Sequence, residues 1–246
     1  NDIEHGPLEC VFTRDEETQL TGASGMEADF MTGDYLINLD SEDEGQVFVS
    51  CAGGKTTTAT FDFTREEAPA NSFFLQCSIK GLTGGHSGDD IEKKRANAIK
   101  ILSRFLYKEM QKFDIRLASF NSGRMHNAIP RDGSFVIAVP SEHKETVRVD
   151  WNVFASEVEN EYHVTDTNMA WNMSSCDATS VLPKHVAFNV IRSLQAVDNG
   201  VFAICQDEML GGMVETSSNV ASVVTADTTL TIVASQRSAI MRNLEN

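Results

Sequence analysis

The feature that most constrains the fold of this 246-residue chain is a long helical pattern set between strand-like runs. From Ile91 to Phe113, apolar residues recur at helical spacing, so one face of this segment is apolar. We expect Asp89 or Asp90 to cap its first turn, because a carboxylate suits the positive end of the helix dipole. A helix with such a face must pack on another element, and the neighbouring strands are the natural partner.

The strand-like segments are rich in β-branched and aromatic residues and are separated by polar turns. We expect them at residues 56–64, 73–79, 116–121, 134–139, 162–173 and 201–205, with a hairpin of 220–225 and 229–234. Two further helices are expected at 144–162 and 183–197. This order predicts an α+β fold in which an antiparallel sheet is covered on one face by helices.

The first 54 residues have a different pattern of short apolar runs, at 9–13, 35–39 and 46–51. We expect these runs to be strands, the first of them buried, and the glycines Gly53 and Gly54 to mark a tight turn or a close approach of the backbone after them. The sequence therefore predicts two domains, 1–54 and 55–246.

Two of these apolar runs end abruptly in carboxylates. One leads into Glu16 and Glu17, and the other leads into Asp40. Adjacent strand ends at one sheet edge would gather these three acids around one pocket. Carboxylate oxygens suit a divalent cation, and a carboxylate that binds no metal can act as a general base. The alternative is a pair of solvated acidic loops. An EF-hand is excluded, because its twelfth position would fall on Cys51 instead of a glutamate.

The composition excludes several classes of partner. The net charge of −16 repels phosphate backbones and anionic lipids, so we expect neither nucleic acid nor membrane partners. No run approaches the roughly 20 apolar residues of a membrane span. The cysteines are odd in number, and Cys10 and Cys51 lie in apolar runs, which predicts reduced, buried thiols and a cytoplasmic location.

Seven short motifs, taken together and in order, resemble the aminoacyl-histidine and cytosol non-specific dipeptidases of the dinuclear zinc metallopeptidase family M20. They are H-G-P-L-E (5–9), T-R-D-E-E (13–17), N-L-D-S-E-D-E-G (38–45), C-A-G-G (51–54), G-G-H-S-G-D-D-I (84–91), N-A-I-P-R (127–131) and V-E-T-S (214–217). The resemblance implies that 1–54 is part of a catalytic-domain sheet. It implies that 55–246 is a lid or dimerisation domain, through which the intact protein forms a homodimer.

The resemblance also implies roles for individual residues. Glu16 corresponds to the general base, and Glu17 and Asp40 to ligands of the two zinc-type ions. His86 corresponds to a histidine that steadies the scissile carbonyl, on a loop whose glycines free the backbone.

Other motif residues are implied to contact the substrate. Asn127 and Arg131 correspond to a substrate-contacting loop, although Arg131 could instead pair with surface acids. Glu215, Thr216 and Ser217 correspond to the loop that receives the C-terminal end of the peptide, or else form a polar turn before a strand.

The chain also departs from the family pattern. The histidine of the H-x-D motif, the bridging aspartate and the C-terminal histidine have no counterpart, and Val201–Ile204 lacks an expected arginine. The sequence lacks an initial Met, which suggests a piece of a longer protein. We therefore expect an inactive fragment, with weak cation binding at most, of an enzyme that hydrolyses Xaa-His dipeptides through a metal-activated water. The alternative is a non-catalytic dimerisation or binding module. A serine or cysteine hydrolase is disfavoured, since no G-x-S-x-G motif occurs.

Overall fold

The computed structural model describes residues 3–16, 20–40, 44–45, 47–48, 50–178, 180–206 and 212–245. The chain divides into two compact units, Asn1–Val49 and Ser50–Asn246, and each is described by itself.

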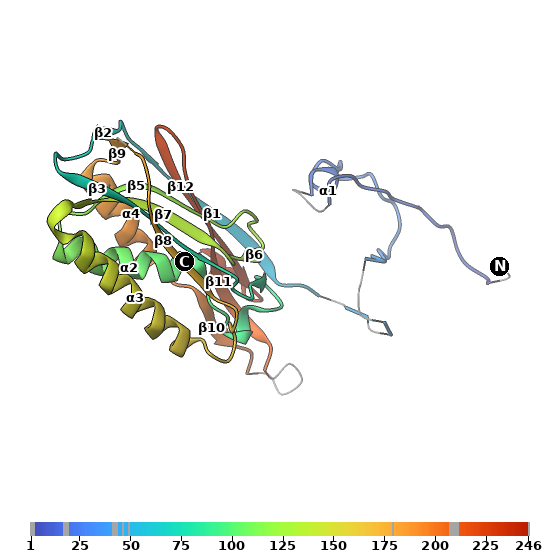
Figure 1. Cartoon of the computed structure of the whole chain (residues 1–246). Coiled ribbons are helices and arrows are strands. Elements are labelled where there is room, and N and C mark those ends of the chain that lie inside the picture. The colour runs from blue at the N-terminus through green and yellow to red at the C-terminus, as the bar shows by residue number, and fades with distance from the viewer. Residues whose placement is uncertain are drawn as a thin grey trace. The chain divides into compact units, whose positions relative to one another are not determined.

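The larger unit is built on an antiparallel sheet that, within the described residues, has eight strands (Figure 1). Their spatial order is β1-β12-β11-β5-β7-β3-β8, and β10 pairs with β11 beside this path. The join between β11 and β5 rests on a single register pair, Val223 with Ser122. The strands are β1 (Gly53–Asp62), β3 (Ser72–Lys80), β5 (Arg116–Ser122), β7 (Gly133–Pro140), β8 (Ala170–Ser175), β10 (Gly200–Ile204), β11 (Val214–Thr225) and β12 (Thr229–Ser238).

Four shorter strands form two small ribbons. β2 (Glu66–Glu67) pairs with β9 (Ser180–Val181), and β4 (Gly85–His86) pairs with β6 (Ala128–Ile129). The second ribbon brings together segments about forty residues apart in the sequence, so it matters for the site described below.

Three helices, α2 (Ala98–Lys112), α3 (Lys144–Glu161) and α4 (Lys184–Ala196), cover one face of the sheet (Figure 1). The shorter helical elements are η1 (Ile91–Lys93), η2 (Ser141–His143), α5 (Met241–Glu245) and, in the first unit, α1 (Thr21–Ser24). Across the described residues, no helix combines the length and apolar character needed to cross a bilayer.

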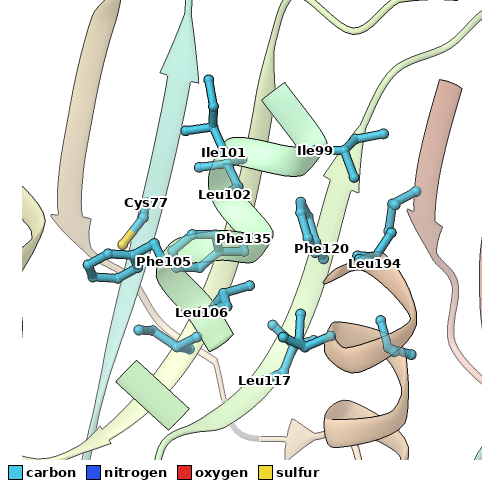
Figure 2. Packing of buried hydrophobic residues seen from close by; sticks show 14 of the residues in the cluster. Cys77, Ile99, Ile101, Leu102, Phe105, Leu106, Leu117, Phe120, Phe135 and Leu194 are labelled. Atoms are coloured by element: carbon cyan, nitrogen blue, oxygen red, sulfur yellow. The ribbon is translucent and has the colours of Figure 1, made fainter. Parts of the chain in front are cut away.

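The core lies between these helices and the sheet (Figure 2). Strand residues alternate, so that Leu75, Cys77 and Ile79 of β3 are fully buried while the residues between them face the other side. Phe105 of α2 lies against Phe135 of β7, with ring centroids 6.0 Å apart, and meets the Trp151 ring of α3 edge-on. The α+β fold with helices on one face of an antiparallel sheet is therefore confirmed.

Most of the elements expected in the larger unit are present, with two corrections. The long helix begins at Ala98, because Asn97 accepts hydrogen bonds from the amides of Ile99 and Lys100 and so caps it. Asp89 and Asp90 do not cap this helix; Asp90 precedes the separate turn η1. The strand expected over 162–173 begins only at Ala170.

The strands expected in the first unit are wrong. Residues 9–13 and 35–39 are irregular, and Phe12, Tyr35 and Leu39 are about nine-tenths exposed, at 92%, 91% and 89%. A strand needs a partner for its amides and carbonyls, and in the described residues neither run pairs with another strand. Cys10 and Cys51 are exposed thiols, contrary to the expected burial. The run at 46–51 lies partly outside the described residues.

Candidate functional site

The β4–β6 ribbon joins two of the sequence motifs, G-G-H-S-G and N-A-I-P-R. His86 pairs with Ala128, and the Ser87 amide donates a 2.8 Å hydrogen bond to the Asn127 carbonyl. Gly85 has φ +137°, and a Cβ there would lie 2.3 Å from the Asp90 carboxylate, so the ribbon requires glycine at this position.

Two carboxylates hold His86, one at its imidazole ring and one at its backbone. Its Nδ1 lies 2.8 Å from Asp89 Oδ2, and its backbone amide donates to Asp90 Oδ2 at 2.8 Å. A hydrogen bond from Lys93 lowers the pKa of Asp90, which keeps this anchor charged. With Nδ1 directed at Asp89, the ring presents Nε2 to its surroundings, and the side chain is 38% exposed.

Arg237 of β12 is a side chain of this cluster that sequence reasoning missed. Its Nη2 lies 3.4 Å from Nε2 of His86, and its Nε is buried without a hydrogen-bond partner among the described residues. The hydroxyl of Ser87, next to His86, is likewise buried without a described partner. A guanidinium beside an imidazole is suited to bind a carboxylate or a carbonyl oxygen.

Ser217 belongs to the same group, whereas its two neighbours are engaged elsewhere. Ser217 is buried on β11 directly opposite Arg237, so the two side chains share a face of the sheet. The Thr216 hydroxyl lies 2.9 Å from that of Ser238, and Glu215 Oε1 is 3.4 Å from the amide nitrogen of Asn243. The structure thus brings Ser217, Arg237 and His86 together, and it connects Glu215 and Thr216 to the C-terminal residues.

The other loop residues separate in space. Asn127 is half-buried in the β4–β6 ribbon. Arg131 donates from Nε to the Leu82 carbonyl at 3.2 Å and lines a cavity whose walls include neither His86 nor Asn127.

The acidic residues of the first unit do not form a metal site by themselves. Glu16 and Asp40 are exposed, and the Asp40 amide donates to Asn38 Oδ1 at 2.9 Å. Glu17 lies outside the described residues. Within those residues, no group of three His, Cys, Asp or Glu side chains could hold a metal ion. The described residues therefore do not fit a zinc centre on their own.

Comparison with known proteins agrees with this architecture. Residues 77–166 match the family model of the M20 peptidase dimerisation domain. The chain is 37% identical over 240 residues to the cytosol non-specific dipeptidase of Escherichia coli (strain K12), covering 97% of this chain and 49% of that protein. It also resembles the crystal structure of aminoacylhistidine dipeptidase from Vibrio alginolyticus, with a TM-score of 0.82 and 37% identity over 95% of this chain and 47% of that one.

The fold and the matched segment define a peptidase dimerisation domain, in which helices cover one face of an antiparallel sheet. More particularly, residues 77–166 match the dimerisation domain of the M20 peptidases, and the chain is similar to dipeptidases over nearly all of its own length. It spans about half the length of the relatives that it matches.

Proposed function

We propose that this chain supplies the substrate-binding lid of an M20 dipeptidase, and that His86 and Arg237 hold the peptide. The proposal rests on two observations about Arg237. Its Nη2 lies 3.4 Å from Nε2 of His86, and its Nε is buried with no hydrogen-bond partner among the described residues. A peptide oxygen placed alongside this pair would accept hydrogen bonds from the guanidinium.

Arg237 and His86 would bind different groups of the peptide. Arg237 pairs with the carboxylate of the dipeptide, since a guanidinium binds carboxylates in a fixed fork. His86 faces the scissile carbonyl through Nε2, while Asp89 holds the ring through Nδ1. Ser217, opposite Arg237, closes the polar wall behind the carboxylate.

The bond-breaking chemistry belongs, in this proposal, to a protein as long as the relatives. There Glu16 is the general base, Glu17 and Asp40 bind metal, and Asn127, Arg131, Glu215 and Thr216 contribute to the substrate cleft. Because the described residues do not fit a zinc centre, we derive no step through a metal here. The chain by itself is proposed to be inactive, with zinc, an Xaa-His substrate and a cytoplasmic location belonging to the longer protein.

Peptide binding to the chain tests the proposal. Alanyl-histidine, titrated while amide chemical shifts are followed, should bind the wild-type chain, and Arg237→Ala should weaken binding about tenfold or more, as expected for a lost charged hydrogen bond. Alanyl-histidine amide, which lacks the carboxylate, should bind both proteins with the same weak affinity.

The control is Arg192→Ala, which removes one exposed cation from α4. It should leave the affinity for alanyl-histidine unchanged. Equal binding of the acid and the amide by the wild-type chain would contradict the role of Arg237. Hydrolysis of alanyl-histidine by the chain with added zinc would contradict its proposed inactivity.

A second function, self-association, is favoured by one edge of the sheet. Among the strands that the structure describes, β8 has a neighbour on only one side. Its A-W-N-M-S-S sequence carries none of the charges or prolines that block edge pairing. Helix α3 exposes Val149 and Val153, at 61% and 53%. We propose that a second copy of the chain pairs along β8 and packs against α3, so that the dimerisation domain forms a homodimer.

A further inference from the structure

A cavity of about 580 Å³ opens on the side of the sheet that the helices leave uncovered. Its floor comes from side chains that alternate with the buried core residues of neighbouring strands. Ser78 of β3 lies in register with Ser134 of β7 on one side and Asn172 of β8 on the other, and Gln76 lines the cavity two residues earlier on β3. The volume falls within the roughly 300–1,000 Å³ of small-molecule sites, so this is a cavity of useful size on a polar floor.

Three cations line the cavity. Lys80 lies at the end of β3, Arg124 follows β5, and Arg131 follows β6. In the described part of the chain, Lys80 and Arg124 make no ion pair, and Arg131 makes only its Nε hydrogen bond to the Leu82 carbonyl. Asp132 is the one carboxylate in the lining. In a chain with net charge −16, this gathering of cations is complementary to an anion.

The wall contributed by the loop into β6 is apolar. Met125, which is about half exposed, lines the cavity together with Ala128 and Ile129. A phosphate ion would leave this wall unused, whereas a carboxylate with an apolar body would contact both the cations and the wall.

We propose that this cavity binds a small organic carboxylate with an apolar body, held by Arg124 and Arg131 with Lys80 at the rim. The lining of the cavity contains neither His86 nor Arg237, the two residues proposed to hold the peptide, and of the residues proposed for the substrate cleft it includes only Arg131. This proposal therefore stands whether or not the chain belongs to a working peptidase.

N-acetyl-leucine is the probe, and isothermal titration of the full chain is the measurement. Wild-type chain should bind one equivalent, with a dissociation constant on the order of millimolar for a ligand of this size. The double variant Arg124→Ala/Arg131→Ala should bind about tenfold more weakly or worse, since charged hydrogen bonds are lost. Lys80→Met should weaken binding several-fold and provides a second variant at an exposed strand position.

Two matched variants control for net charge and for the neighbouring site. Arg192→Ala removes one cation outside both sites and should bind N-acetyl-leucine as the wild type does. Arg237→Ala disables the candidate peptide site and should retain saturable binding at the cavity. The proposal is overturned if the wild type shows no saturable binding or if Arg192→Ala weakens it as much as the double variant does. It is also overturned if Arg237→Ala abolishes binding, or if inorganic phosphate binds as tightly as N-acetyl-leucine.

Discussion

At the residue scale, Lys100 shows how one side chain completes a helix that belongs to another part of the sequence. Its Nζ donates to the carbonyls of Leu194 at 2.5 Å and Val197 at 2.7 Å, at the C-terminal end of α4. These carbonyls have no partner within the helix, and a cation there also suits the negative end of the helix dipole. Partial burial lowers the pKa of Lys100, yet its three donors remain directed at backbone oxygens.

Replacing Lys100 by Met should therefore destabilise the protein. Lys100→Met keeps the apolar stem but leaves the α4 carbonyls unsatisfied, which should lower the free energy of unfolding by about 1–3 kcal/mol. Urea unfolding followed by circular dichroism measures this change. Lys108→Met, which removes a surface ammonium 3.8 Å from Glu157, should cost less than about 0.5 kcal/mol. Equal losses in the two variants would show that the contacts to α4 do not matter.

Only some residues of the candidate site could be predicted from the sequence. His86 was found because glycines surround it and a motif contains it. Arg237 was not predicted, because the family pattern places an arginine in β10. In the sheet, β12 lies beside β11, and its Arg237 contacts His86. Strand order in a sheet is a non-local property that residue spacing does not encode. An arginine at the end of the predicted hairpin was the one available signal.

At the scale of elements, a buried carboxyl group connects α2 with α3. Glu109 of α2 is fully buried, and Lys112 lies 2.7 Å from it and 2.8 Å from Asp150 of α3. Desolvation raises the pKa of Glu109, and the hydrogen bond to Asp150 raises that of Lys112. A carboxyl whose pKa is higher in the folded state favours folding at low pH, and this contribution is lost as the pH rises through the folded-state pKa.

The substitution Glu109→Gln should remove this pH dependence. From pH 4.5, the ordinary value for glutamate, upward to neutral pH, the wild type should lose stability relative to Glu109→Gln. The difference between the two free energies of unfolding can grow by at most about 1.4 kcal/mol per pH unit. Urea unfolding at four pH values across this window measures it. Glu159→Gln, at an exposed position of α3, should track the wild type; parallel curves for Glu109→Gln and the wild type would refute the prediction.

The helices and strands were predicted well only where their own apolar periodicity is strong or where the partner strand is adjacent in the sequence. Helices α3 and α4 and the β11–β12 hairpin agree with their periodicity and turn residues. The runs at 9–13 and 35–39 have strand composition, but composition cannot supply the neighbouring strand that a ladder requires, and both are irregular. The start of α2 was misplaced because an αL residue, Lys94, ends the η1 turn before Asn97 caps the helix.

At the scale of the whole molecule, the free β8 edge leads to a prediction about assembly. The double variant Val149→Glu/Val153→Glu places carboxylates on the exposed face of α3, where the proposed second copy would bury them unpaired. Size-exclusion chromatography with light scattering should give twice the chain mass for the wild type and the monomer mass for this variant.

Val164→Glu is the matched control for the assembly experiment. Val164 is 77% exposed but lies in the turn after α3, so this substitution adds a carboxylate outside the proposed interface and should leave the dimer intact. A wild-type chain that is monomeric at all concentrations measured would contradict the homodimer proposal.

The sparse join between β5 and β11 has a mechanical consequence. With one register pair at this seam, few backbone bonds resist bending of the two halves of the sheet against each other. Helix α2 follows β3 and leads into β5, whereas α4 leads into β10 and β11, and the two helices pack against each other above the seam. Packing of the helix layer, together with the hydrogen bonds of Thr225 to Phe120 and Asn121, therefore joins the two halves where the ladder is sparse.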